Sequence, residues 1–393
     1  VMMIQQLQRT FAFMALSQRE AFTPRSLIGV LPKWCRMGRQ EDASELFRSI
    51  VDIVEGGFRK RVFGQEHDER GKGKGEMVDD VDAIIPFQGT LVNKVICSDC
   101  KTVSISKEPF VDITLNLSGE KEEEEEESIS KLIEKIGKPI TLKGSEQYSC
   151  KQCSGLRDAT KMTQIKFPPP KHLVLTLARF RYNLATGMSE KVISPVSIGE
   201  TIEVQTTMNG TGENRIVRFK LHAVQMHSGR SAAHGHYYTI SRSSSSAKSA
   251  AMAEAMMAGQ GASSTAQTST WFQFNDRLVT RSSFERMCEI TKYFETDVPY
   301  MLFYVRERIG GEGEGGEGEG EEEMKFPEQV LAEVFSDNSR LLLEIEELAE
   351  RKSEHFQQHR RDPGGDDGSG GDGGSSGNDV QPMMSTIVPK FVC

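Results

Sequence analysis

Two Cys-x-x-Cys pairs limit the possible folds of this chain more than any other feature. Cys97 and Cys100 form the first pair, and Cys150 and Cys153 form the second. Each pair suits a tight turn that aims two thiolates at one ion, and two such turns complete a tetrahedral Cys₄ zinc site. The gap between the pairs is longer than in a compact zinc ribbon, so we expect them on two separate hairpins. Free thiols are the alternative, but the pattern favours structural zinc.

Composition limits the compartment and the partners. The chain has seven cysteines, and its first residues do not read as a secretory signal because polar residues interrupt them. We therefore expect a reducing compartment, the cytoplasm and/or nucleus, where metal binding is favoured over disulfides. The formal net charge of -9 argues against nucleic acid as the main partner and suits a basic protein partner. No apolar run approaches transmembrane length, so no membrane partner is expected.

The first residues predict a helix whose apolar periodicity is already under way at the start of the sequence. Ile4, Leu7, Phe11 and Met14 fall at helical spacing with no cap before them, over residues 1–19. Residue 1 is a valine. We therefore expect that the natural N-terminus lies upstream.

A second helix is expected to open at Asp42. Asp42 and Glu45 lie three residues apart near its start, where acidic side chains suit the helix dipole. A solvated helix start is the simpler interpretation, and the sharper one is a pair of carboxylates presented to a basic peptide. The apolar face of this helix, spaced three or four apart, comprises Ala43, Leu46, Phe47, Ile50, Val51 and Val54.

Most of the remaining chain reads as strands joined by polar insertions. Acidic, Gly/Glu-rich and Ser/Ala-rich runs mark the insertions and the tail. The expected strands are residues 108–117, 172–180, 216–224, 237–241, 271–274 and 300–306, with a short helix near 283–293 and a helix or helix pair over about 329–358.

A strand, loop and strand over residues 219–240 hold a candidate catalytic histidine. Gly235 leaves room for a substrate chain beside His236, which can act as a general base near neutral pH. Asn275, at the polar end of a later strand, could accept the imidazole N–H and fix the tautomer. The alternatives are a hydrogen-bonded core or loop histidine, or a metal site built from the four histidines of this stretch. The pair lacks a nucleophile.

Six motifs in order carry a resemblance to a known family. They are GRQEDASE at 38–45, the two Cys-x-x-Cys pairs, LVLTLARF at 173–180, GHYY at 235–238, WFQFND at 271–276 and YMLFY at 300–304. In this order they resemble the ubiquitin-specific proteases, from residue 1 to about residue 306. The resemblance implies an α+β, papain-like cysteine protease fold with a helical thumb, a β-rich palm and zinc-binding fingers.

The resemblance also implies subdomains and roles for particular residues. The expected subdomains are a thumb with its start removed at 1–60, a flexible insertion at 61–83, zinc-binding fingers at 84–165, a palm at 166–306 with a low-complexity loop at 242–270, and a mostly disordered tail at 307–393. By resemblance His236 is the base, Asn275 its orienting partner and Asp276 an adjacent supporting residue. Asp42 and Glu45 match the acidic residues that meet the arginines of the ubiquitin tail.

One expected segment does not occur. In this family the nucleophilic cysteine lies in a Gly-Asn-Thr-Cys-Tyr-like segment before the first helix seen here, and no such segment exists in residues 1–393. Cys35, Cys288 and Cys393 do not match it. We therefore expect the nucleophile upstream, and we expect residues 1–393 alone to be inactive.

The predicted function is that of a thiol-dependent deubiquitinase. It would cleave isopeptide bonds after the C-terminal glycine of ubiquitin, with ubiquitin and ubiquitinated proteins as partners. Two alternatives stay open at this point. One is a catalytically inactive ubiquitin-binding pseudoenzyme, and the other is a zinc-dependent protein-interaction scaffold.

Overall fold

The computed structural model describes residues 2–19, 21–35, 41–63, 86–118, 127–183, 187–208, 213–231, 234–243, 271–307, 325–360 and 390–391. The chain forms two compact units. The described part of the first lies within residues 31–307. The second combines residues 2–30 with the described residues from 325 onward. The predicted thumb of residues 1–60 is thus divided between the units.

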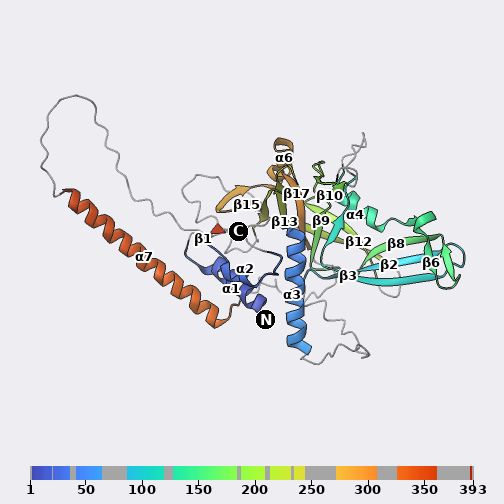
Figure 1. Cartoon of the computed structure of the whole chain (residues 1–393), viewed down its shortest axis with the longest axis horizontal. Coiled ribbons are helices and arrows are strands. Elements are labelled where there is room, and N and C mark those ends of the chain that lie inside the picture. The colour runs from blue at the N-terminus through green and yellow to red at the C-terminus, as the bar shows by residue number, and fades with distance from the viewer. Residues whose placement is uncertain are drawn as a thin grey trace. The chain divides into compact units, whose positions relative to one another are not determined.

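A twelve-stranded sheet dominates the described part of the first unit (Figure 1). Its path runs β16-β15-β14-β13-β12-β8-β2-β3, while β17 pairs with β13 and β9, β4 with β9, and β5 with β8. The strands are β2 (Gly89–Cys97), β3 (Val103–Phe110), β4 (Ile113–Leu115), β5 (Ile140–Leu142), β8 (Ala159–Lys166), β9 (His172–Leu177), β12 (Thr201–Thr207), β13 (Asn214–Ser228), β14 (His236–Arg242), β15 (Trp271–Asn275), β16 (Leu278–Ser282) and β17 (Val298–Arg306).

The core lies where β9, β13 and β17 meet. From Leu173 to Leu177 every residue of β9 is buried, and β17 is buried continuously from Val298 to Leu302. Such unbroken apolar runs belong to strands covered on both faces. In contrast, β12 alternates exposed and buried residues, as a strand with one solvated face does. The central strands therefore form a rigid base for the loops at their ends.

Two short hairpins and three helices complete the described part of the first unit. The strand pairs are β6 (Tyr148–Cys150) with β7 (Gly155–Arg157), and β10 (Phe180–Asn183) with β11 (Met188–Lys191). The helices are α3 (Ala43–Phe63), α4 (Ile129–Gly137) and α6 (Phe284–Tyr293), with a 3₁₀ turn at Gly144–Glu146. Ser128 and Ser283 cap α4 and α6 by accepting the backbone N–H three residues on. The hairpins β2–β3 and β6–β7 extend away from β13, β15 and β17 (Figure 1).

Two predicted strands are each broken in the structure. The strand expected over residues 108–117 divides into β3 and β4 at Val111 and Asp112, because the Asp112 carboxylate turns to bind Arg48. The strand expected over 172–180 ends at Leu177. There the Arg179 side chain, 1% exposed, donates to the carbonyls of Pro299, Val192 and Ser194. In both places a buried polar side chain is bound by groups that are distant in sequence.

The second unit is built on two helices, α1 (Met2–Leu16) and α7 (Glu328–Arg360). Ala12 and Phe13 of α1 are buried with Val334 of α7. Asn338 accepts the Gln18 N–H at 2.8 Å and donates to the Leu16 carbonyl at 3.0 Å, so it caps the end of α1. The unit also contains α2 (Arg25–Val30), which lies in a segment expected to be a connector, and β1 (Ala21–Phe22) paired in parallel with β18 (Lys390–Phe391).

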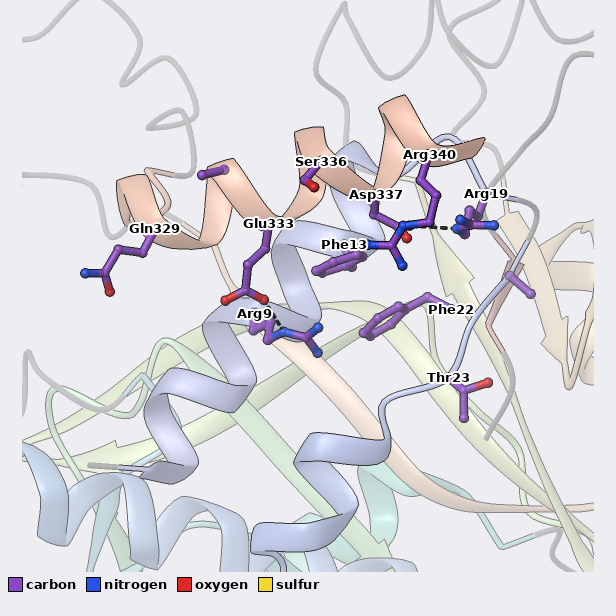
Figure 2. Close-up of a pocket in the computed structure, with 12 residues that line it drawn as sticks. Arg9, Phe13, Arg19, Phe22, Thr23, Gln329, Glu333, Ser336, Asp337 and Arg340 are labelled. Atoms are coloured by element: carbon purple, nitrogen blue, oxygen red, sulfur yellow. Dashed lines mark hydrogen bonds and ion pairs between the residues drawn. The ribbon is translucent and has the colours of Figure 1, made fainter. Parts of the chain in front are cut away.

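An open cleft lies between α1, β1 and α7 (Figure 2). The Arg9 guanidinium lies 4.8 Å from the ring centre of Phe13 and pairs with Glu333 at 2.6 Å. Arg19 pairs with Asp337 at 2.7 Å. These contacts tie α1 to α7 by charge as well as by apolar packing.

Several predicted segments fall outside the described residues. They are most of the insertion at 61–83, most of the acidic run at 121–127, most of the low-complexity loop at 242–270, and most of the tail other than α7 and β18. The helix predicted over about 329–358 corresponds to α7, a single helix. No helix within the described ranges combines the length and apolar character needed to cross a membrane.

Candidate active site

The structure brings His236 and Asn275 together. His236 is the first residue of β14 and Asn275 the last of β15, and these strands pair antiparallel. The distance from His236 Nε2 to Asn275 Oδ1 is 2.6 Å. The amide oxygen only accepts hydrogen bonds, so Nε2 carries the proton and Nδ1 keeps its lone pair. That tautomer is the one a general base needs.

Asp276 lies next to this pair. Its Oδ2 is 3.8 Å from His236 Nε2, farther than a hydrogen bond. Asp276 has φ of 50° in the turn that joins β15 to β16, a left-handed conformation that aspartate tolerates better than most residues. The His236 and Asp276 side chains are 45% and 58% exposed, so both are open to an incoming chain.

The other histidines of the central stretch differ from His236. His227 is 3% exposed, and burial lowers its pKa to about 4, with the Lys191 charge adding to the effect. Burial also lowers the pKa of His222. A side chain at Gly235 would collide with the His227 imidazole, so glycine allows β14 to begin this close to β13. His227 is therefore a neutral core histidine, packed against Phe180 and Tyr237.

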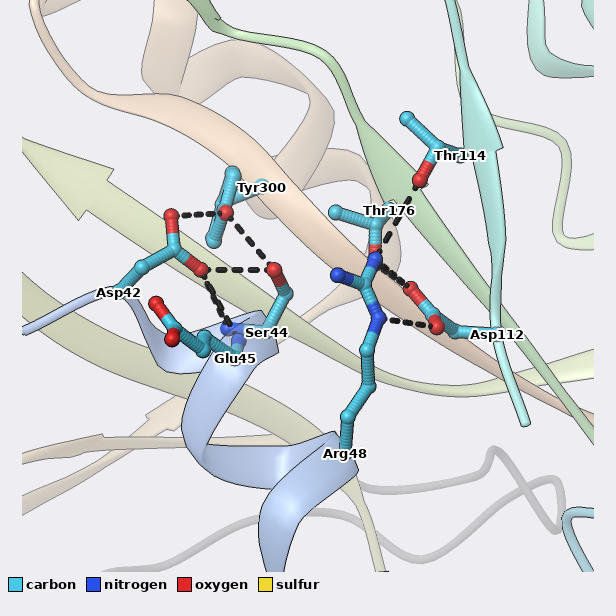
Figure 3. A network of polar contacts seen from close by, with 8 residues as sticks. All are labelled: Asp42, Ser44, Glu45, Arg48, Asp112, Thr114, Thr176 and Tyr300. Carbon is cyan, nitrogen blue, oxygen red and sulfur yellow. Dashed lines mark hydrogen bonds and ion pairs between the residues drawn. The ribbon is translucent and has the colours of Figure 1, made fainter. Parts of the chain in front are cut away.

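Asp42 is engaged inside the molecule (Figure 3). Its Oδ1 accepts from the Ser44 N–H at 2.8 Å, the Ser44 hydroxyl at 2.6 Å and the Glu45 N–H at 3.2 Å, which caps the start of α3. Its Oδ2 accepts from the Tyr300 hydroxyl at 2.6 Å. Burial raises the pKa of Asp42, but these hydrogen bonds outweigh it and leave the pKa below its ordinary value. Glu45, in contrast, is exposed.

A second network lies one turn further along α3 (Figure 3). The Arg48 guanidinium donates two hydrogen bonds to Asp112, at 2.6 and 2.7 Å, and the Thr176 hydroxyl donates a third at 2.7 Å. The Asp112 side chain is 3% exposed. Because Asp112 precedes β4 and Thr176 belongs to β9, this carboxylate fixes α3 against the central sheet.

The four paired cysteines converge at the tips of the β2–β3 and β6–β7 hairpins, as predicted. Their sulfur atoms all lie within 4.8 Å of one another. The Cys97–Cys153 and Cys100–Cys150 Sγ distances are 3.9 and 3.6 Å. Four sulfurs bound to one tetrahedral Zn²⁺ lie about 3.8 Å apart, given Zn–S bonds of about 2.3 Å. The cluster therefore has the donor set and spacing of a closed metal site.

Both cysteine turns share one backbone feature. Lys101 and Ser154, each directly after the second cysteine of a pair, have φ of 59° and 51°. The left-handed residue turns the chain back so that both thiols of a pair face one point. Without an ion, hydrogen bonding to Thr102 lowers the pKa of Cys100 to about 6, and hydrogen bonding to Cys100 raises the pKa of Cys153 to about 12.

The two remaining described cysteines lack the properties of a nucleophile. Burial, together with the Glu41 carboxylate, raises the pKa of Cys35. Burial also raises the pKa of Cys288, which packs against the core on α6. A reactive cysteine needs the opposite shift, because the thiolate is the attacking species. Cys393 lies outside the described residues.

Comparison with known proteins gives the family. The family profile described as ubiquitin carboxyl-terminal hydrolase matches residues 2–304. The chain belongs to this family. Human ubiquitin carboxyl-terminal hydrolase 35 is 29% identical over 230 residues, which are 58% of this chain and 21% of that protein. Human ubiquitin carboxyl-terminal hydrolase 42 is 27% identical over 280 residues, 70% of this chain and 17% of that protein.

The family's shared fold agrees with the one described above. The SAGA Ubp8/Sgf11/Sus1/Sgf73 DUB module bound to ubiquitin aldehyde contains a chain with a TM-score of 0.51 and 19% identity, over 72% of this chain and 53% of that one. The predicted α+β, papain-like class with thumb, palm and fingers is confirmed, as is the resemblance to the ubiquitin-specific proteases. The chain spans about a fifth of the length of the two human relatives.

Sequence reasoning missed the residues that hold the site in place. Arg48, Asp112, Lys191 and Asp297 belong to no motif, and Tyr300 opens the YMLFY motif without having been given a role. Each acts through partners far along the chain. One signal was available for Asp112, a carboxylate inside an otherwise alternating strand. The others have no local pattern that separates them from surface residues.

Proposed function

We propose that this chain is the ubiquitin-recognition and general-base portion of a cysteine deubiquitinase. The observation that carries the proposal is the 2.6 Å contact between His236 Nε2 and Asn275 Oδ1 in a member of the ubiquitin carboxyl-terminal hydrolase family. It leaves Nδ1 of an exposed imidazole free to take a proton. The reaction class is acyl transfer from the C-terminal glycine of ubiquitin to a thiol and then to water.

The roles of the residues follow from this geometry. His236 Nδ1 takes the thiol proton, and the thiolate attacks the carbonyl carbon of the ubiquitin glycine. As the C–N bond breaks, the imidazolium returns the proton to the leaving amine. His236 then deprotonates a water that hydrolyses the thioester and restores the thiol. Asn275 keeps the imidazole in the required tautomer throughout, and Asp276 supports the positive ring.

The nucleophile is proposed to come from outside residues 1–393, upstream of Val1. The raised pKa values of Cys35 and Cys288 support this, because neither thiol is activated. We expect residues 1–393 alone not to react with a ubiquitin-derived electrophilic probe. Labelling of either cysteine would contradict this assignment.

Zinc and ubiquitin are the proposed ligands. The four-cysteine cluster would hold Zn²⁺ in a structural role, since all four positions are filled by the protein. Glu45 is proposed to meet the basic tail of ubiquitin directly, while Asp42 shapes the helix start that presents it. We propose the cytoplasm and/or nucleus as the location, which imaging of the tagged natural protein would test.

The decisive experiment uses the natural protein that includes the nucleophile. It is compared with His236→Ala and Asn275→Ala on a ubiquitin–fluorophore substrate and on isopeptide-linked diubiquitin. We expect His236→Ala to abolish turnover and Asn275→Ala to reduce it, with ubiquitin binding retained in both. Normal turnover with His236→Ala would overturn the assignment of the base.

A ubiquitin-binding pseudoenzyme is the second candidate, favoured by the raised pKa values of Cys35 and Cys288, the two described cysteines outside the four-cysteine cluster. It predicts that the natural protein binds ubiquitin but neither cleaves the substrates nor reacts with the probe.

A further inference from the structure

One lysine holds the end of β13 through three hydrogen bonds. Lys191 Nζ donates to the carbonyls of His227 at 3.0 Å, Gly229 at 2.7 Å and Thr296 at 2.7 Å. An ammonium group has three N–H donors and no acceptor, so these carbonyls use its full capacity. His227 belongs to β13, Gly229 is the first residue after β13, and Thr296 lies before β17. Lys191 thus joins two segments that are remote in sequence.

A carboxylate next to Thr296 makes a second connection. Asp297 Oδ1 accepts from the Ser228 hydroxyl at 2.6 Å, and Oδ2 accepts from the Tyr238 hydroxyl at 3.0 Å. Tyr238 is 6% exposed, and burial raises its pKa, so the phenol stays protonated and donates. Asp297 therefore bridges β13 and β14.

These contacts surround the start of β14, where His236 lies. Ser228 is directly opposite His236 in the β13–β14 ladder. Tyr238 follows His236 by two residues and so lies on the same face of the strand. The segment between the strands is closed at its base, because a side chain at Gly229 would lie 2.9 Å from the His234 carbonyl oxygen and 3.0 Å from Gly235 Cα.

We propose that Lys191 and Asp297 form a clamp that positions His236 against Asn275. The proposal rests on the role of His236 given above, and it assigns to Lys191 and Asp297 an indirect role. The clamp fixes the backbone opposite His236 from two sides, through the Gly229 and His227 carbonyls and through the Ser228 hydroxyl. Without it, the backbone opposite His236 would lose the side-chain hydrogen bonds that fix it from two sides.

The chemistry of the clamp explains why a lysine is needed. Three carbonyl oxygens converge on one point, and a compact cation with three rotatable donors satisfies them together. Burial lowers the pKa of Lys191 to about 8, as expected for an ammonium removed from water, while the Asp297 charge acts in the opposite direction. An apolar replacement would remove the donor that these oxygens share, and we expect the turn to rearrange toward water.

The test is the tautomer of His236, read from ring ¹⁵N–¹H correlation spectra of residues 1–393 and assigned with His236→Gln. In the unaltered chain we expect a single Nε2–H form. In Lys191→Met we expect the ring nitrogens to shift toward the average of the two tautomers. Lys220→Met is the matched control, since Lys220 is exposed on β13 eight residues before Ser228, and it should leave the spectrum unchanged.

Ser228→Ala provides a milder break that removes one hydrogen bond while keeping Lys191. It should move the His236 signals in the same direction by a smaller amount. In the natural protein, kcat should fall by about 10²-fold in Lys191→Met, as expected for a catalytic group displaced by about 1 Å, with KM for the ubiquitin substrate unchanged. If Lys191→Met folds and its His236 tautomer is unaltered, the proposal is overturned. If Lys191→Met does not fold, an unaltered tautomer in folded Ser228→Ala overturns it. The tautomer needs no substrate, so this result is separate from a failure of His236 as the base.

Discussion

The pair of Arg48 and Asp112 allows a quantitative test of how α3 is fixed. The Asp112 side chain is 3% exposed and the Arg48 side chain is 42% exposed. Arg48→Met keeps the aliphatic stem but leaves a buried carboxylate with Thr176 as its remaining described donor. Breaking a fully buried pair costs about 3–5 kcal/mol, and losing a hydrogen bond to a charged group costs about 1.5–3 kcal/mol. Since water reaches the guanidinium side, we expect about 2–3 kcal/mol.

Urea unfolding of the variants measures this cost. Asp112→Asn removes the charge, so Arg48→Met should cost less in that background, and a double-mutant cycle gives the coupling. Arg218→Met is the matched control, because Arg218 and Glu203 form a pair that is 58% and 56% exposed. We expect a change within about 0.5 kcal/mol for that control. If Arg48→Met costs no more than Arg218→Met, the argument from burial is refuted.

Three further predictions concern metal, recognition and acid. Elemental analysis should find one zinc per chain, and removal of the metal by a chelator should lower the melting temperature. A metal-free protein in which all four thiols of the cluster can be titrated would contradict the proposed zinc site. Asp42→Ala should lower the free energy of unfolding by about 1–3 kcal/mol, because the α3 cap is lost and Tyr300 loses its acceptor. Glu45→Arg should change the free energy of unfolding by no more than about 0.5 kcal/mol and weaken ubiquitin binding about tenfold. Equal losses of stability in the two variants would refute this division of roles. Burial lowers the pKa of His172 and His227 to about 4 from an ordinary 6.5. As the pH falls, the unfolded chain therefore binds protons before the folded chain does, and the free energy of unfolding should decrease from pH 6.5 to pH 4. If this dependence of stability on pH is unchanged in His227→Gln, His227 does not contribute to it.

Much of this architecture could be predicted from the sequence, because several of the sequence patterns that indicate it are local. A Cys-x-x-Cys turn places two thiols by itself, and two turns therefore predicted the cluster before any tertiary contact was known. Apolar runs predicted the central strands β9 and β17, since burial on both faces requires such runs. The positions of His236 and Asn275 followed from strand ends within ordered motifs, and the two side chains do meet.

Tertiary structure alone decided which polar groups are engaged and which are exposed. Asp42 and Glu45 look equivalent in the sequence, three residues apart on one helix start. Tyr300, 258 residues further on, occupies one Asp42 oxygen, whereas Glu45 is exposed. Lys191 likewise reads as one of many lysines until three carbonyls converge on it. The physical reason is that periodicity fixes the face on which a residue lies, whereas the partner of a buried charge is selected by desolvation among groups that only the folded chain brings together.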